Sequence, residues 1–429
     1  MEQFIQPARP EWEALVRRSL PDDGAVDATV RRILRTVREC GDEGLREIIL
    51  AVEGRVPDPI QVTETEFDAA EKAVPAPLKE AIQEAADRIA AFHTLQKPQE
   101  VVWDDGSGIV CRRRFIPVER VGLYVPGGSA PLFSTLLMLA IPAGIAGCRE
   151  RILCTPAGRD GTISPAILHA ARICDVDTVF KIGGAQAVAA LAYGTETVPK
   201  ADKIFGPGNR YVLKAKQFVS QEGISIDMPA GPSEVMVVAD RTACPAFVAA
   251  DLLSQAEHGP DSQAILVCSD TIFAEAVKTE LLRQKSLLPR ETIVEQALSH
   301  SRIVILPDRD DQLAFANRYA PEHLILSVQD PEEAAGKITA AGSIFLGNYS
   351  PESAGDYASG TNHTLPTHGY ATAYNGVNLD SYCRKITFQH LTEEGIRHIG
   401  RAVELMAEAE QLDAHKNAMT LRIKAVNGE

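Results

Sequence analysis

The stretch LLSQAEHGPDSQ ends an apolar helical pattern with an amide, a carboxylate and an imidazole, those of Gln255, Glu257 and His258. Gln255 and His258 stand three residues apart, so on a helix both side chains face the same side and can reach a single metal ion. A second interpretation stays open: His258 caps the helix C-terminus, where the dipole favours an imidazolium, and Gly259 supplies a left-handed cap. Amide oxygens are uncommon zinc ligands, so the spacing alone does not decide.

Glu322 and His323 are adjacent in RYAPEHLILS, between a helical pattern and a strand pattern. A carboxyl group whose pKa burial can raise, beside an imidazole that titrates near neutral pH, suits general acid–base catalysis. A solvated pair of loop residues is the alternative at this position.

A polar stretch rich in Gly and Ser, residues 348–369, contains Asp356, His363 and His368. A carboxylate with imidazoles suits zinc or another borderline divalent ion. An Asp in such a stretch is also a common turn former. Loops of this length inside compact domains are usually functional or disordered.

The tail EAEQLDAHKNAMTLR carries Glu410 and His415. On one continuous helix, side chains five residues apart diverge by about 140°, so the two can converge only if the helix breaks. Asp413 is a good N-cap for a second helix, which would provide that break. Otherwise both are surface residues.

Two glycine-containing turns are candidates for a nucleotide site, because a phosphate could approach the backbone there. They lie in FKIGGAQAVAALAYG and IFGPGNRYV. Neither turn has the G-x-G-x-x-G pattern, because Tyr211 stands where the third glycine would follow Gly206 and Gly208. GLYVPGG, residues 122–128, is either a ligand-facing loop or a simple turn. The pattern alone therefore gives little support for dinucleotide binding.

The elements that must position these residues alternate between short β-branched runs and amphipathic stretches, which predicts parallel sheets covered on both faces and hence an α/β fold. The expected strands are RILCTP from Arg151, VDTVFKIGG from Val176, EVMVVAD from Glu234, AILVCSD from Ala264, RIVILPD from Arg302, HLILSV from His323 and SIFLGN from Ser343. Residues 11–95 are expected to be mostly helical, and GIRHIGRAVELMAEAEQL near the C-terminus has one apolar helical stripe.

The longest apolar run, residues 132–147, is shorter than the roughly 18 residues that a membrane span requires, and we interpret it as a buried helix ended by Pro142 and the following glycines. The N-terminus has charges and prolines in place of a signal peptide's apolar run. Eight scattered cysteines without a C-x-x-C pair indicate reduced thiols and a cytoplasmic protein. No membrane partner is expected.

The chain has 429 residues, 45% of them hydrophobic, enough for two or three domains with ordinary cores. Its 43 Lys and Arg against 58 Asp and Glu give a net charge of -15, which would repel a phosphate backbone. Nucleic acid is therefore not expected as a partner.

Several of these segments together resemble the histidinol dehydrogenases: IDMPAGPSEVMVVAD, DLLSQAEHGPDSQ, GGAQAVAALAYGTETVPKADKIFGPGN, YAPEHL and AGDYASGTNHTLPT. The resemblance extends from about residue 24 to AHKNAMTLR in the tail. It implies a zinc- and NAD-dependent enzyme that oxidises L-histidinol to L-histidine in two steps, through the aldehyde, at the end of histidine biosynthesis. It also implies a homodimer in which the tail completes the neighbour's site.

The resemblance assigns roles to matching positions. It implies that the metal ligands are Gln255, His258, Asp356 and His415, and that Glu322 and His323 do the acid–base work. Substrate contacts would come from these six residues together with Ser233, His363 and Glu410. NAD contacts would come from Tyr124, Gln186 and Asn209.

The fold that the resemblance implies has two incomplete Rossmann-like parallel-sheet domains, a helical N-terminal segment and a small helical tail. We expect the N-terminal segment at residues 1–21 and a main domain, with the metal and substrate site, formed by residues 22–123 and 234–377. A second domain with the NAD contacts spans residues 124–233. The tail, residues 378–429, takes part in dimerisation.

The chemistry itself restricts the roles. Zinc is redox-inert, so the nicotinamide takes the hydride, while zinc can hold the amine and imidazole of histidinol as a template. A base must remove the hydroxyl proton in the first oxidation, for which His323 is suited. The second oxidation requires water to add to the aldehyde, a task for Glu322.

Two alternatives stay open. A thiol enzyme would use Cys111 or Cys154 to form a thiohemiacetal in the second step, and three arginines, residues 112–114, could lower the pKa of Cys111. A regulatory protein that binds metal or nucleotide without turnover is the other, although the intact pair of Glu322 and His323 argues against it.

Overall fold

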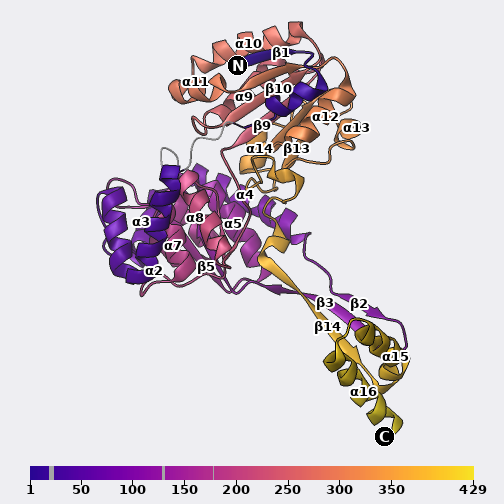
Figure 1. The fold of residues 1–429 in the computed structure, drawn as a ribbon. Helices are drawn as coiled ribbons and strands as arrows, with labels where there is room; N and C mark the ends of the chain where they lie inside the picture. The colour runs from indigo at the N-terminus through magenta and orange to yellow at the C-terminus, as the bar shows by residue number, and fades with distance from the viewer. Residues whose placement is uncertain (19–23, 128–130, 177) are drawn as a thin grey trace.

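The computed structural model of the chain describes residues 1–18, 24–127, 131–176 and 178–429. Two parallel sheets, each covered by helices on both faces, lie beside one another, and an arm projects from them (Figure 1). The predicted α/β class with N-terminal and C-terminal helices is confirmed, and all seven predicted strands are present. The predicted boundary at 21/22 and Gly128 of the GLYVPGG segment lie outside the described residues.

The first sheet has six strands, all parallel. In order across the sheet they are β1 (Glu2–Ile5), β11 (Arg302–Ile305), β10 (Gln263–Cys268), β9 (Glu234–Ala239), β12 (His323–Ser327) and β13 (Ser343–Leu346). One face packs against α9 (Pro245–Ala256), α10 (Thr271–Lys285) and α11 (Glu291–Ser299), and the other against α1 (Trp12–Leu15), α12 (Arg309–Tyr319) and α13 (Pro331–Ala335). The predicted helical N-terminal segment thus contains α1 and, in addition, an edge strand that was too short for the sequence pattern to reveal.

The second sheet has five parallel strands. In order they are β6 (Thr178–Lys181), β5 (Glu150–Thr155), β4 (Arg120–Tyr124), β7 (Lys203–Phe205) and β8 (Ser225–Ile226). One face packs against α2 (Gly24–Glu53), α7 (Gly184–Tyr193) and α8 (Arg210–Gln221), and the other against α3 (Glu64–Ala73), α4 (Ala76–Thr94), α5 (Phe133–Ala146) and α6 (Pro165–Ile173).

This packing corrects the predicted domain division. The division joined residues 22–123 to 234–377, but α2, α3 and α4 bury their apolar faces on the five-stranded sheet of the other domain. An apolar helical stripe shows that a helix packs against something without showing which of two sheets it covers.

Helix α5 also differs from its prediction, because Pro142 lies inside the helix, which continues to a left-handed cap at Gly147. Proline has no N–H to donate to the carbonyl four residues earlier. That carbonyl, on Met138, instead accepts a hydrogen bond of 2.6 Å from the Asn362 side chain. The proline therefore leaves an acceptor that fastens the 348–369 segment to α5.

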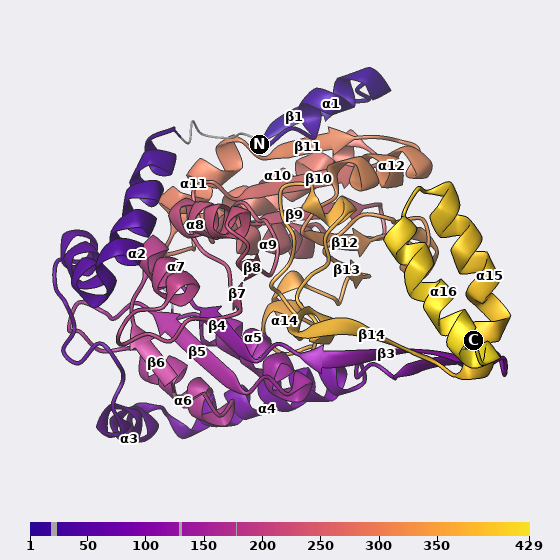
Figure 2. The same ribbon diagram turned by 60° about the horizontal axis from the view of Figure 1, so that its bottom comes forward.

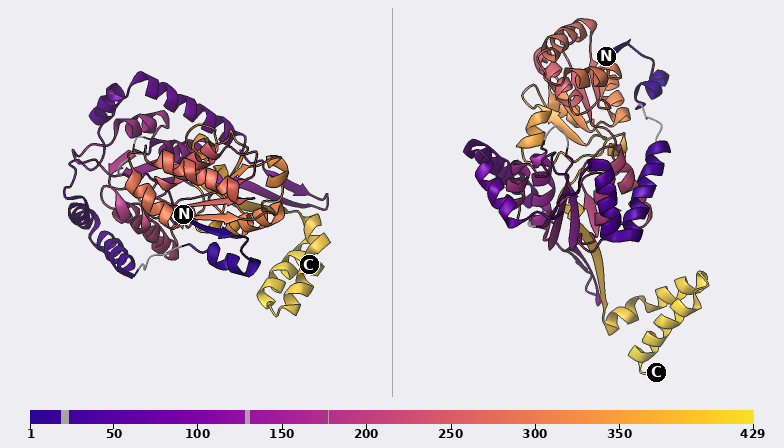
Figure 3. Two further views of the ribbon diagram at one scale, coloured as in Figure 1. Left: turned by 90° about the horizontal axis from the view of Figure 1, so that it is seen from above. Right: turned by 90° about the vertical axis from the view of Figure 1, so that its left-hand side faces the viewer.

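The arm is built from two distant parts of the chain. β14 (Cys383–Leu391) pairs antiparallel with β3 (Ile109–Pro117), which pairs with β2 (Val101–Asp104). Beyond them α15 (Glu393–Ala409) and α16 (Asp413–Asn427) pack together, well away from both sheets (Figure 3). The predicted tail at 378–429 thus shares its arm with β2 and β3.

The expected helix break lies between α15 and α16, with Leu412 as the cap and Asp413 as the first helical residue. No helix among the described residues is long and apolar enough to cross a membrane.

Gly206, directly after β7, gives a test of the packing between strands. Its φ is +127°, and a Cβ there would collide with the main-chain carbonyl of Tyr124 on β4. We expect Gly206→Ala to lower the free energy of unfolding by about 3 kcal/mol, because backbone and not a flexible side chain must move. Gly223 is the matched control: its φ is +90° with nothing within 4 Å of a Cβ, so Gly223→Ala should cost only about 1 kcal/mol. Equal losses in urea unfolding would contradict this account.

Candidate active site

A cavity of about 580 Å³ lies between the two sheets and is lined by residues of both. The five-stranded sheet contributes the turn after β7, at residues 206–209, and Gly127 after β4. The six-stranded sheet contributes Ser233 and Glu322, which precede β9 and β12. The carboxyl ends of one sheet thus face the amino ends of the other. Figure 2 shows α14 (Glu352–Tyr357) between the two sheets.

The cavity brings together most of the residues singled out from the sequence. Its lining includes Asn209, Ser233, Gln255, His258, Glu322, His323, Asp356 and His363. Glu410 and His415 are exposed on the arm, away from the cavity (Figure 1). His368 does not line it and packs instead against Gly231.

The pair Glu322 and His323 is buried and is held by the first residue of β9. The Glu234 N–H donates to the Glu322 carboxylate at 2.8 Å, and the His323 Nδ1 lies 3.2 Å from the Glu234 carbonyl oxygen. The two side chains are 3.7 Å apart at their nearest nitrogen and oxygen. The alternative of a solvated loop pair is therefore wrong.

Four polar side chains gather beside this pair. Ligand atoms of His258, Glu352 and Asp356 lie within 4.8 Å of one another. Both side-chain polar atoms of Gln255 and both carboxylate oxygens of Glu352 are buried without a hydrogen-bond partner. Since buried polar atoms are nearly always paired, these orphans suit a cation that the four groups would surround. The donor set of nitrogen and oxygen ligands fits zinc.

The local structure at His258 favours the metal interpretation over the capping one. Helix α9 ends at Ala256 with Glu257 as its cap, and Gly259 is not left-handed. His258 is accessible from the cavity but surrounded by protein elsewhere, and this desolvation lowers its pKa, so the ring stays neutral and able to bind metal.

Burial and the crowding of carboxylates shift the pKa values of the residues in this cluster. Burial raises the pKa of Glu322 to about 8 and that of Glu352 well above its usual range. Burial opposes protonation of His323, but the nearby carboxylates of Glu352, Glu322 and Asp356 outweigh it and raise the pKa of His323 to about 10. Although burial acts in the opposite direction, contact with His323 keeps the pKa of Asp356 below its ordinary value. Carboxylates this crowded favour binding of a cation.

His363 is fixed by α5 and by α14. Its Nε2 lies 3.1 Å from the Thr135 hydroxyl, and its Nδ1 lies 2.9 Å from the Asp356 carbonyl oxygen. The neighbouring Asn362 is the residue that bonds to Met138. Residues 348–369, expected to form a loop, therefore contain the short helix α14, and hydrogen bonds of Asn362 and His363 fasten them to α5.

The cofactor side of the cavity is the switch point of the five-stranded sheet, between β4 and β7, where nucleotides bind in many α/β folds. Asn209 lines the cavity and caps α8, accepting from the N–H groups of Tyr211 and Val212. Lys216 and Asp227, both buried, form an ion pair of 2.5 Å and both bond to the main chain of Gly206.

Tyr124 and Gln186, the other two expected NAD contacts, do not line the cavity in this single chain. The Gly184 N–H donates to the Tyr124 hydroxyl at 3.0 Å, and the Gln186 amide donates to Glu53 at 3.1 Å. Both side chains are buried next to the cofactor side.

The thiol alternative finds no support in the geometry. Cys154 is fully buried, which raises its pKa well above the usual range, and Cys111 lies on β3 in the arm. Neither residue lines the cavity.

Glu352 is the site residue that the sequence analysis missed. It stands four residues before Asp356, and on α14 this spacing puts both carboxylates on one face. The spacing in PESAGD was the available signal. Arg290, which lines the cavity, had no such signal.

Comparison with known proteins now decides the family. The sequence pattern of the family described as Histidinol dehydrogenase matches residues 16–423. The chain belongs to the histidinol dehydrogenase family. It is therefore an NAD-dependent oxidoreductase of histidine biosynthesis.

Relatives agree over the full length. The chain is 52% identical over 426 residues to a histidinol dehydrogenase of Bacteroides fragilis, covering 99% of this chain and 100% of the relative. A Xanthomonas axonopodis histidinol dehydrogenase is 52% identical over 395 residues, 92% of each chain. The crystal structure of histidinol dehydrogenase from Elizabethkingia anophelis superimposes with a TM-score of 0.97 at 49% identity, covering 100% of this chain and 99% of that one.

The gathered ligands predict how metal binding responds to substitution. We expect His258→Asn and Asp356→Ala each to weaken zinc binding by more than about tenfold while the fold survives, because the remaining ligands come from separate segments. The measurement is zinc content after dialysis against a competing chelator. His169→Asn is the control, since His169 bonds to Glu71 and does not line the cavity. Full zinc retention in both site variants would rule out these ligands.

Proposed function

We propose that this member of the family oxidises L-histidinol to L-histidine in two NAD-dependent steps through L-histidinaldehyde, with one zinc ion per subunit. The observation that carries the proposal is that unpaired buried ligand atoms adjoin the pair of Glu322 and His323: Gln255 lines the same cavity, and Glu352 lies 3.8 Å from the His323 ring. A metal-binding cluster and an acid–base pair at one site are what a templated oxidation of a small polar alcohol requires.

The metal ligands that we propose are Gln255, His258 and Asp356, with His415 supplied by the arm of a second subunit, and the buried Glu352 carboxylate adjoins this set. Zinc, when bound, would hold the amine and imidazole of histidinol and so fix the carbinol carbon relative to the nicotinamide. Ser233 and His363 line the same cavity and would contact the rest of the substrate, together with Glu410 of the arm.

His323 is proposed as the base of the alcohol step. With Nδ1–H donated to the Glu234 carbonyl, the free electron pair of the ring is on Nε2, which faces the cavity side toward Asp356 at 3.6 Å. A bound cation that neutralises Asp356 and Glu352 would remove two of the three carboxylates that raise the pKa of His323 and so favour the neutral ring that a base requires.

Glu322 is proposed to activate water in the aldehyde step. Its carboxylate is oriented by the Glu234 N–H, and its raised pKa, about 8, gives it the basicity that proton abstraction from water needs. A free carboxylate at the usual pKa would be a weaker base.

NAD is proposed to bind at the switch point between β4 and β7, with Asn209 in contact. Tyr124 and Gln186, the other expected contacts, are buried beside it and would have to turn toward the cofactor or act through Gly184 and Glu53, to which they bond. Asn209 lines the same cavity as Glu322 and His323, so NAD bound there would share the cavity with the acid–base pair.

A homodimer is proposed from the arm. Its exposed apolar side chains include Val102, Trp103, Phe388, Met406 and Leu421, between 42% and 65% exposed in the single chain. Apolar surface on a projecting arm favours association.

With no disulfide among its eight cysteines, the enzyme is suited to the cytoplasm.

Glu322→Gln tests the division of labour. The change keeps the size of the side chain and removes the proton acceptor, so the rate with histidinal should fall by about 10²–10⁴-fold while the first hydride transfer from histidinol suffers less. The measurement is NADH formation from each substrate; the wild type should give two NADH per histidinol and one per histidinal. Equal slowing of both steps would remove Glu322 as the water base.

Complementation tests the shared site. His415→Ala and His258→Ala chains should each be inactive alone, and mixed heterodimers should regain part of the activity because one of their two sites has both residues intact. Activity of purified heterodimers carrying two different tags is the readout. Verified heterodimers without recovered activity would show that His415 acts within its own chain or not at all.

A further inference from the structure

The N-terminal segment brings a buried arginine into the interior of the six-stranded domain. Arg18 donates from Nε and Nη2 to the two carboxylate oxygens of Glu234, at 2.8 and 2.9 Å, and the two side chains are only 11% and 2% exposed. In the described part of the chain, no other Lys, Arg or His side chain forms an ion pair with Glu234. The Arg18 guanidinium also lies 3.7 Å from the Tyr319 ring centre and donates to the Tyr319 carbonyl at 2.7 Å.

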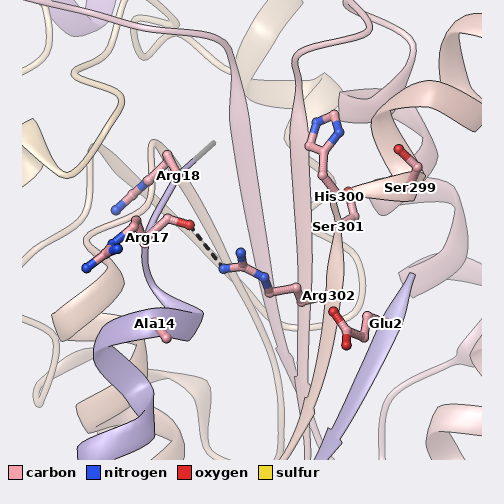
Figure 4. A pocket seen from close by; sticks show the side chains of 8 residues that line it. All are labelled: Glu2, Ala14, Arg17, Arg18, Ser299, His300, Ser301 and Arg302. Atoms are coloured by element: carbon pink, nitrogen blue, oxygen red, sulfur yellow. Dashed lines mark hydrogen bonds between the residues drawn. The ribbon is translucent and has the colours of Figure 1, made fainter. Parts of the chain in front are cut away.

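The segment that carries Arg18 is anchored on this domain. Arg302 on β11 donates to the main-chain carbonyls of Leu15 and Arg17, and Figure 4 shows the bond to Arg17 with the Arg18 side chain extending away from Arg302. Trp12 packs edge-on against Phe315 of α12, with ring centres 5.5 Å apart. These contacts fix the end of the segment, so Arg18 can hold Glu234 in one place.

The main chain of Glu234 is the shared support of the two proposed catalytic residues. Its N–H donates to Glu322, and its carbonyl accepts from His323. Its carboxylate accepts a further bond of 3.0 Å from the His368 N–H. The side chain of Glu234 thus faces Arg18 while its backbone orients the acid–base pair.

We propose that Arg18 is a positioning residue, which acts through its ion pair with Glu234 to hold Glu322 and His323 in their catalytic orientation. The inference rests on the catalytic roles proposed above for those two residues. Without Arg18, the buried carboxylate of Glu234 keeps the bond from the His368 N–H but has no opposite charge beside it, so it shifts toward water and displaces the first residue of β9. A displacement of about 1 Å in a catalytic group can cost up to about 10²-fold in rate.

Three variants test the proposal: Arg18→Met, Glu234→Gln and the two changes combined. The combined variant leaves no unpaired buried charge, so it can be measured even if Arg18→Met alone fails to fold. We expect kcat with histidinal to fall by about tenfold or more in Arg18→Met and in the combined variant, because both lack the hydrogen bonds from Arg18 that anchor residue 234. The loss in Glu234→Gln should be smaller, since its amide oxygen can still accept a hydrogen bond from Arg18. The KM for NAD and the zinc content should stay within about twofold of wild type, because neither site contacts Arg18.

Arg9→Gln is the matched control. Arg9 lies on the same segment and pairs with Asp311 of α12 at 2.6 Å, but the two side chains are 71% and 33% exposed and neither bonds to Glu234. This variant should keep the wild-type kcat. If Arg9→Gln lowers kcat as much as the Arg18 variants do, the segment has only a general structural role and the proposal is overturned.

Combination with Glu322→Gln separates the positioning role of Arg18 from the catalytic role of Glu322. If Arg18 acts through Glu322, the combined Arg18 and Glu234 change should slow histidinal oxidation much less in a Glu322→Gln background than in the wild type. Equal, additive losses, or an unchanged kcat in the folded Arg18 and Glu234 variants, would overturn the positioning role while leaving the role of Glu322 intact. If Glu322→Gln itself leaves histidinal oxidation unchanged, the proposed function of Glu322 and the positioning role both fail.

Discussion

Crowded, unpaired polar groups beside the acid–base pair are the constraint on which the site depends. Gln255 and Glu352 have buried side-chain atoms without partners, and Asp356 and His258 lie beside them. Such a cluster costs free energy in the folded chain unless a cation or a substrate completes it. A fold that keeps this cost gains a preorganised site in return, since the ligands need not rearrange when the ion and substrate arrive.

The arrangement of the two sheets explains why one cavity can contain both the acid–base pair and the proposed cofactor site. In many α/β proteins the ligand lies at the carboxyl ends of the strands. In the six-stranded sheet that edge is occupied: between β9 and β12, Asp240 accepts bonds from Arg309 and the Gln329 N–H, and Asn348 bonds to Ser327. The acid–base pair lies instead at the amino ends of the same strands, where it faces the open carboxyl edge of the five-stranded sheet.

Local pattern predicted much of this molecule, namely seven of the strands, the α/β class and the end of α9 before Gly259, because these depend on neighbouring residues. The resemblance supplied the grouping of Gln255, His258 and Asp356, which sequence spacing cannot give. What could not be predicted depends on distant contacts: which sheet α2 to α4 cover, how residues 101–117 join the arm, and the pairing of Arg18 with a carboxylate 216 positions away. Pro142 was misjudged because Asn362, far along the chain, satisfies the carbonyl it leaves free.

The central claim is that these side chains bind one zinc ion, and X-ray diffraction of zinc-loaded crystals at the zinc absorption edge tests it most directly. The account predicts a single strong anomalous peak per subunit, within bonding distance of the His258 imidazole and the Asp356 carboxylate. A zinc peak elsewhere, with none between these two residues in fully loaded protein, would contradict it.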